Sequence, residues 1–250
     1  MKFRIVGWLC VLGLFHPVSP IIPRLDAAQL FPLKRASATP TAQIPWHDLD
    51  ERASALAQQM LIKPTIFARG PSETFPCMPE QYLWLLDNPD RVVIAWRRLG
   101  AKCVNITRRE NGRFAYTDEH GSDLSWETIH RSPTVRIWYA EGKVKPAVAL
   151  PMVPVKAMVI LRHTEGKTPD GNTVIQHQAE LLIHTESRTA AAFTKVIGQS
   201  ATKVAEQGLG HLQLFYSALS SYVDRYPDRV DALFRPDNGQ AIQQTQKTSR

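Results

Sequence analysis

An amphipathic stretch near the C-terminus, residues 187–223, constrains the fold most. Its apolar residues recur at steps of three or four, the spacing that places side chains on one face of an α-helix. The members of this stripe are Phe193, Ile197, Ala201, Val204, Gly208, Leu212, Phe215, Leu219 and Tyr222. A helix with so long an apolar face must bury it against another surface. Three glycines, Gly198, Gly208 and Gly210, permit either a close backbone approach or a break in the helix.

The preceding segment has the pattern of an antiparallel sheet. Between residues 103 and 184, apolar and polar residues alternate, and turn sequences such as Asn111-Gly112 interrupt the alternation. About six strands in succession indicate a meander and not βαβ units. A short strand at 66–69 and two short helices, at 80–86 and 91–99, come before it. We therefore expect an α+β fold, with an antiparallel sheet of about six to seven strands wrapped on the long C-terminal helix.

One connection within the meander is unusual. Residues 143–154 are mostly apolar and include three prolines. Apolar side chains in such numbers are not expected to remain in water. The segment therefore gates a cavity, packs against the long helix, or meets a partner or a membrane.

The N-terminus has the features of an export signal. Lys2 and Arg4 precede an apolar run at residues 5–15, as in a secretory signal peptide, and residues 25–28 offer an imperfect small-residue cleavage site. The run is shorter than the roughly 20 residues of a spanning helix. An uncleaved anchor and a buried helix are the alternatives. We expect an exported protein, periplasmic or secreted, which is anchored to the membrane if the segment is retained.

These features divide the chain into five parts. Residues 1–28 are the signal peptide or anchor, and residues 29–46, rich in Pro, Ala, Thr and Ser, are a linker. An N-terminal helix occupies 47–64, the α+β domain occupies 65–235, and the polar residues 236–250 form a disordered tail.

The expected order of elements is a short strand, two short helices, about six antiparallel strands and a long C-terminal helix. This order resembles the START-like, or helix-grip, superfamily over roughly residues 66–226. The resemblance is architectural, and no sequence motif carries it. It implies a curved sheet around the helix, with an apolar cavity for a lipid or other hydrophobic ligand between them. Lipid carriers, cyclases and binding proteins all share this fold, so the resemblance transfers no functional residue.

The last hairpin supplies the first candidate residues. On its second strand, His177 shares a face with Ile175, Ala179, Leu181 and Ile183. If the turn centres near Thr168, Val159 of the first strand lies opposite His177. His177 then points into the core or a cavity, where it is either a ligand contact or acid/base group, or a core histidine bonded to a neighbour.

Aromatic residues supply the other candidates. Trp126 shares a face with Leu124, and Tyr139 shares a face with Ile137. Aromatic rings with a polar tip suit a ligand pocket and also an ordinary core. Arg136 and Trp138 lie on the opposite face from Tyr139, where Arg136 faces solvent or, if the facing is inverted, meets a carboxylate head group. The complete set of expected cavity residues is His177, Trp126, Tyr139, Val159, Phe193, Leu212 and Phe215.

Cysteines and charges add weaker expectations. Outside the signal segment only Cys77 and Cys103 remain, which form either a disulfide in an oxidising compartment or two free thiols. No Cys/His spacing indicates a metal site, and no cofactor is expected. The net charge is +7. A basic run at residues 91–113 contacts solvent or an anionic membrane surface. Nucleic-acid binding would need stacking aromatics on the same face, and the export signal argues against it.

Three hypotheses follow. The first is a protein that binds a small apolar ligand or lipid between the sheet and the C-terminal helix. The second is a structural or interaction protein of the cell envelope with a solid core and no ligand. The third is an enzyme that uses His177 in a cavity. No strong catalytic motif supports the third, and a continuous apolar cavity would separate the first from the second.

Overall fold

The structure is a computed structural model that describes residues 44–62, 64–118, 121–145, 152–185 and 201–235. Their longer elements follow one another in this order: α1 (Glu51–Leu61), β1 (Ile66–Arg69), β2 (Glu73–Pro76), α2 (Pro79–Asp87), α3 (Pro89–Arg98), β3 (Ile106–Arg108), β4 (Phe114–Thr117), β5 (Asp123–Arg131), β6 (Val135–Val144), β7 (Val153–Lys167), β8 (Thr173–Thr185), α5 (Ala201–Arg225) and α6 (Val230–Phe234). The signal segment, residues 29–43 of the linker, the tail and Phe193 lie outside the described residues. The last linker residues are described, and Ile44 is buried in the core beneath α1.

The strands form one antiparallel sheet of eight strands, in the order β1-β8-β7-β6-β5-β4-β3, with β2 also paired to β8. This confirms the expected α+β fold. The count exceeds the expected six to seven because β1 and β2 occupy successive parts of the same edge of β8. Gly70 lies between them, and a Cβ atom there would overlap with the side-chain amide of Gln213 in α5. The interruption of this edge strand is thus a site of close approach to the helix.

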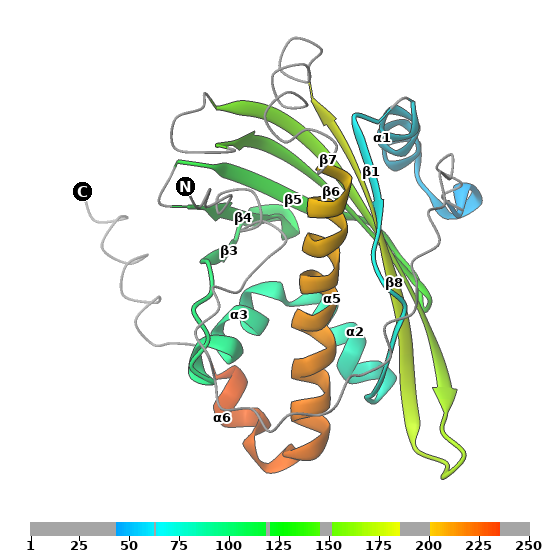
Figure 1. Ribbon diagram of the computed structural model, residues 1–250, viewed down its shortest axis with the longest axis vertical. Helices are drawn as coiled ribbons and strands as arrows, with labels where there is room; N and C mark the ends of the chain where they lie inside the picture. The colour runs from blue at the N-terminus through cyan, green and yellow to red at the C-terminus, as the bar shows by residue number, and fades with distance from the viewer. Residues whose placement is uncertain (1–43, 63, 119–120, 146–151, 186–200, 236–250) are drawn as a thin grey trace.

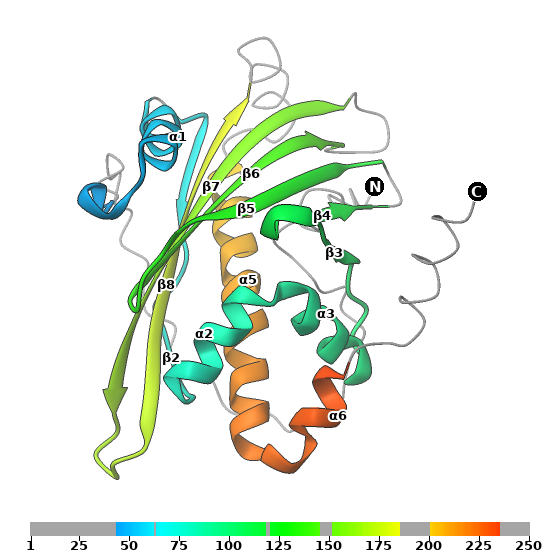
Figure 2. The ribbon, with the colours of Figure 1, turned by 180° about the vertical axis from the view of Figure 1, so that it is seen from behind.

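Helix α5 lies along the concave face of the curved sheet, which we call the inner face (Figures 1 and 2). It contacts β1, β2 and β8, and the short helices α2 and α3 pack beside it. The helix runs without interruption through Gly208 and Gly210. Gly210 faces Pro71, so this glycine allows a close approach and does not break the helix. Residues 187–200 of the expected helix lie outside the described residues.

The opposite, outer face of the sheet carries α1 (Figures 1 and 2). Asp50 begins this helix as an N-cap, since its Oδ1 accepts a hydrogen bond from the amide of Ala53 at 2.6 Å. Ala57 and Met60 pack against a second apolar core that includes Met158 and Leu182. The sheet therefore buries apolar side chains on both faces.

The expected apolar connection at 143–154 is shorter than the sequence suggested. Val144 pairs with Val153, and both are buried at the end of the β6–β7 hairpin. Residues 146–151 lie outside the described part of the chain. Among the helices that are described, none has the length and apolar character needed to cross a bilayer.

Candidate functional site

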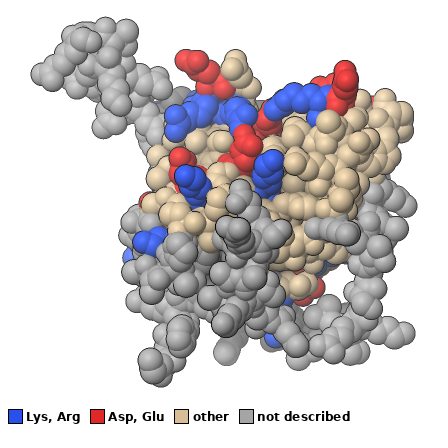
Figure 3. Space-filling view, turned by 90° about the horizontal axis from the view of Figure 1, so that it is seen from above, with Lys and Arg blue, Asp and Glu red and all other residues tan. Residues whose placement is uncertain are grey.

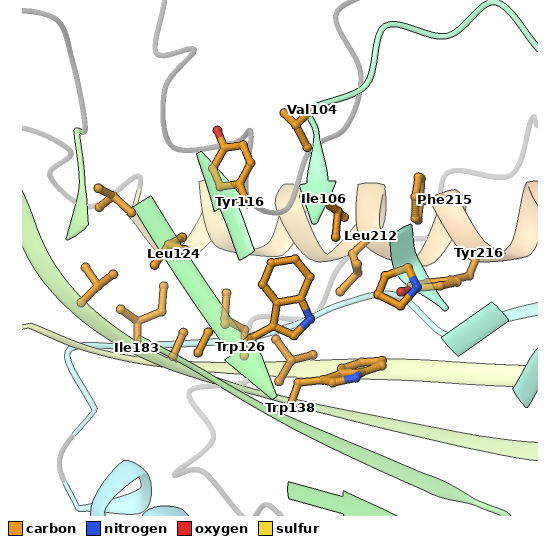
Figure 4. A pocket seen from close by; sticks show the side chains of 17 residues that line it. Val104, Ile106, Tyr116, Leu124, Trp126, Trp138, Ile183, Leu212, Phe215 and Tyr216 are labelled. Atoms are coloured by element: carbon orange, nitrogen blue, oxygen red, sulfur yellow. The ribbon is translucent and has the colours of Figure 1, made fainter. Parts of the chain in front are cut away.

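A cavity of about 140 Å³ lies between α5 and the inner face of the sheet (Figure 4). Its walls come from α5, from the strands β3 to β8, from the start of α3 and from the connection between α3 and β3. The lining residues are Pro89, Val104, Ile106, Tyr116, Leu124, Trp126, Trp138, Ala140, Val144, Val155, Ala157, Val159, Leu181, Ile183, Leu212, Phe215 and Tyr216. None of them carries a formal charge. The arrangement therefore suits an apolar guest.

The floor of the cavity is made by small side chains on two central strands. Ala140 of β6 and Ala157 of β7 are directly opposite one another, so their methyl groups point to the same face. Both are half-buried, although each lies within a central strand of the sheet. Val155 and Leu161 on the same face of β7 are buried. The space thus opens above the two alanines and closes on either side.

The cavity has an aromatic end and an aliphatic end. Along the inner face of β6, the side chains in order are Val144, Ala140 and Trp138, and Trp126 of β5 pairs with Ala140. The two indoles are therefore diagonal neighbours on one face. Figure 4 shows the Trp126 indole extending from the sheet toward α5 and Leu212, and the Trp138 indole closer to the strands. Valines and leucine form the walls at the opposite end, near the β6–β7 turn.

Donor groups are concentrated at the aromatic end. The indole N–H groups of Trp126 and Trp138 donate to no residue that the structure describes, nor does the Tyr216 hydroxyl. Burial raises the pKa of Tyr216 and keeps its hydroxyl protonated. By contrast, the Tyr116 hydroxyl is already bonded to Asp118 at 3.0 Å. The aromatic end can therefore donate hydrogen bonds to a guest without losing bonds within the protein.

A buried ion pair lies beyond Trp138 on the same face. Arg136 is 5% exposed and binds both carboxylate oxygens of Asp87 at 3.1 Å, and it also donates to the Ser132 carbonyl at 2.9 Å. The facing of β6 is therefore the inverse of the one expected first: Trp138 lines the cavity, and Arg136 meets a carboxylate of the protein instead of solvent. The positive charge of Arg136 is compensated by a carboxylate of the same fold.

Four of the expected cavity residues do line the cavity, namely Trp126, Val159, Leu212 and Phe215. Tyr139 does not, because it lies on the outer face with Ile137, in the core beneath α1. The error has a physical cause. The strand β6 buries apolar side chains on both faces, because α1 covers the face that was expected to meet water. Phe193 lies outside the described residues.

His177 is buried on the inner face but does not line the cavity. The expected register was also wrong: His163 is opposite His177, and Val159 is opposite Leu181, because the hairpin turns two residues later than Thr168. In the observed register His177 lies away from Val159, in a polar cluster at the other end of the inner face.

That cluster satisfies both ring nitrogens of His177. Nδ1 and the Tyr82 hydroxyl share a hydrogen bond of 2.6 Å, and Nε2 is 3.2 Å from Glu73 Oε2, which also accepts from Ser217 at 3.1 Å. Burial raises the pKa of Tyr82 well above its ordinary value, so the phenol remains a donor. This arrangement matches the alternative of a core histidine bonded to its neighbours.

His163 lies in the same cluster in a less favourable environment. It is 4% exposed, its ring contacts the ring of Tyr82 at 5.3 Å, and its ring nitrogens make no hydrogen bond of normal geometry to the described residues. Burial, with the nearby charge of Arg136, lowers the pKa of His163 to about 4. His163 is therefore neutral near pH 7.

Cys77 and Cys103 are free thiols, the second of the two alternatives. Cys77 is buried after β2 and donates to the Met78 carbonyl at 3.3 Å, whereas Cys103 lies in the connection between α3 and β3. Burial raises the pKa of each thiol to about 11. Neither thiol is activated as a nucleophile. No group of three or more His, Cys, Asp or Glu in the described residues could hold a metal ion.

The basic run at residues 91–113 is spread over several elements and meets acidic partners. Arg108 pairs with Asp90 at 2.9 Å, and Arg113 pairs with Glu127 and Glu141 on the outer face. On the face seen in Figure 3, Lys and Arg side chains lie among Asp and Glu side chains. The described surface there is mixed in charge.

No family model and no curated protein matches the chain. Similar solved structures include a conserved protein from Geobacillus kaustophilus, with 13% identity over 63% of this chain and 96% of that one and a TM-score of 0.43. A hypothetical protein from Helicobacter pylori has 11% identity over 62% and 87%, with a TM-score of 0.38. An uncharacterized protein from Bacillus thuringiensis has 14% identity over 60% and 98%, with a TM-score of 0.33. Because the identities and TM-scores are low, these similarities do not indicate a function.

Proposed function

We propose that this chain is an exported binding protein that holds a small apolar molecule or lipid between its sheet and α5. One observation carries the proposal: a cavity of about 140 Å³ between the sheet and α5, whose described lining residues are all uncharged. A guest that fills this space would remove its apolar walls from water, which is favourable.

The cavity favours this hypothesis over its two alternatives. A structural envelope protein with a solid core has no use for a void above two facing alanines, Ala140 and Ala157. An enzyme that uses His177 would need the imidazole at the cavity wall, and His177 does not line it. Binding is therefore the function to test first.

The test is to find the bound molecule. The protein would be purified from its own compartment, weighed by native mass spectrometry, and extracted for analysis of released small molecules. We expect an additional mass on the wild-type protein that organic extraction removes. Ala157→Leu, which fills the cavity floor, serves as the matched control and should lack that mass. Wild-type protein that carries no extra mass and binds no added apolar probe would contradict the proposal.

Export is the second part of the proposal, supported by the charged start and the apolar run at residues 5–15. Cell fractionation of a C-terminally tagged chain would test it, with Leu9→Arg as the control that interrupts the run. The wild-type chain should leave the cytoplasm and the variant should remain there. Sequencing the N-terminus of the exported form would then separate a cleaved signal from a retained anchor. Equal distribution of both chains would overturn this part.

A further inference from the structure

The ligand's chemistry can be narrowed from the walls of the cavity, if the proposed function holds. The volume of the cavity sets the first limit on the ligand. An apolar cavity of about 150 Å³ accommodates a benzene ring, and this cavity has about 140 Å³. A single ring or a short branched chain fits within it. A two-chain lipid would leave most of its volume outside.

Charge is the second limit. None of the described lining residues is ionised, and Arg136, the buried cation two residues from Trp138 on the same face, already binds Asp87 through two hydrogen bonds of 3.1 Å. A carboxylate or phosphate placed inside would lose its hydration without gaining a counter-charge. The cost of burying an unpaired charge is large compared with the gain from filling the cavity. The guest is therefore uncharged.

Hydrogen bonding is the third limit. An indole nitrogen can donate but cannot accept, and Trp126 and Trp138 both present theirs at the aromatic end with no partner among the described residues. A guest that approaches this end without an acceptor leaves both donors unsatisfied. A guest with one carbonyl or ether oxygen can satisfy one of them.

We propose that the ligand is an uncharged molecule of roughly six to ten non-hydrogen atoms with one hydrogen-bond acceptor. The acceptor points to Trp126 and Trp138, and the apolar remainder lies over Ala140 and Ala157. Small aromatic or branched ketones, esters and ethers belong to this class. Free fatty acids and phospholipids do not.

Three probes with the same number of non-hydrogen atoms test this on the full chain: acetophenone, isopropylbenzene and benzoate. Binding would be measured by calorimetry, with palmitate and phosphatidylcholine vesicles as further probes. We expect acetophenone to bind about tenfold tighter than isopropylbenzene, the value of one hydrogen bond. Benzoate, palmitate and the vesicles should bind at least tenfold more weakly than acetophenone.

Two variants locate the acceptor. Trp126→Phe and Trp138→Phe each keep an aromatic ring and remove one N–H donor. At least one of them should abolish the preference for acetophenone while its affinity for isopropylbenzene stays within about threefold, which also shows that the variant is folded. Trp84→Phe, on the exposed side of α2, should change neither affinity.

The outcomes separate the two proposals. Isopropylbenzene binding as tightly as acetophenone, benzoate or palmitate binding comparably, or a preference that survives both Trp variants would overturn the ligand class and leave a binding function in place. If no neutral probe binds at all, both the ligand class and the proposed function fail.

Discussion

Alternate residues of one strand meet two different environments. On the outer face of β7, Met158 and Ile160 have no exposed surface and lie beneath α1. On the inner face of the same strand, Ala157 and Val159 are half-buried, and the space above them is the cavity. The backbone and the neighbouring strands are the same for all four residues.

The difference shows that the cavity does not result from a loosely formed sheet. The outer core closes because α1 packs Ala57 and Met60 against the branched and long side chains of the strands. The inner face opens where the strands themselves carry alanine and α5 presents Leu212 and Phe215. Side-chain volume at a few positions thus decides which face is solid.

The largest loss of stability is expected from shortening a side chain on the outer face. Ile160→Ala should lower the free energy of unfolding by about 2–4 kcal/mol, because it removes fully buried methyl groups from the outer core. Urea unfolding followed by circular dichroism would measure it. Ile160→Val is the graded control, at about 1 kcal/mol. A loss of less than 1 kcal/mol for Ile160→Ala would mean that the outer core is not tightly packed.

The second-largest effect should come from acid, which destabilises the fold through His163 at the polar end of the inner face. The pKa of His163 is about 4 in the folded protein and about 6.5 when the chain is unfolded. Below pH 6.5 the unfolded state binds this proton first, so stability falls as the pH decreases from about 6.5 to about 4. The loss should be on the order of 2–3 kcal/mol.

The measurement is the urea midpoint at a series of pH values. His163→Phe keeps a ring beside Tyr82 and should remove this part of the pH dependence. His47→Gln changes an exposed histidine and should leave the dependence as it is in the wild type. A wild-type profile that is flat between pH 6.5 and pH 4 would show that His163 is solvated.

The architecture was predictable because its signals are local. Period-two alternation with turn sequences, followed by a helical stripe that includes Leu212 and Phe215, is sufficient to predict an antiparallel sheet against a C-terminal helix. The cavity residues Trp126 and Val159 followed from the same alternation. The α1 helix was also visible in the sequence, although its docking site on the sheet was not.

Tertiary contacts decided what could not be predicted. Tyr139 and Trp138 were assigned to the wrong faces because a strand covered on both sides has no polar face to orient it. His177 was misplaced because a shift of two residues in the turn moves its partner by four. A signal that could have located the cavity is the pair of inward alanines, Ala140 and Ala157, on neighbouring central strands.

Filling the inner face should cost little, in contrast to filling the outer one. Ala157→Leu inserts a side chain into existing space, so the unliganded protein should keep its stability within about 1 kcal/mol or gain slightly. Ala57→Leu on α1 is the matched change in the solid core, where the same atoms meet packed neighbours. It should lose about 1–3 kcal/mol. Equal losses for both variants in urea unfolding would contradict the contrast between the faces.

Shortening a side chain on the inner face should have the smallest effect. Val159→Ala removes two methyl groups that already border the cavity, so few contacts are lost and the free energy of unfolding should fall by less than about 1 kcal/mol. Ile160→Ala, one residue away, gives the reference for a packed site. Thermal unfolding of the two variants, each without ligand, compares the faces within one strand. A loss for Val159→Ala as large as that for Ile160→Ala would mean that Val159 is fully packed within the protein. The space beside Val159 would then not be available to a ligand, and the proposed binding site would be contradicted.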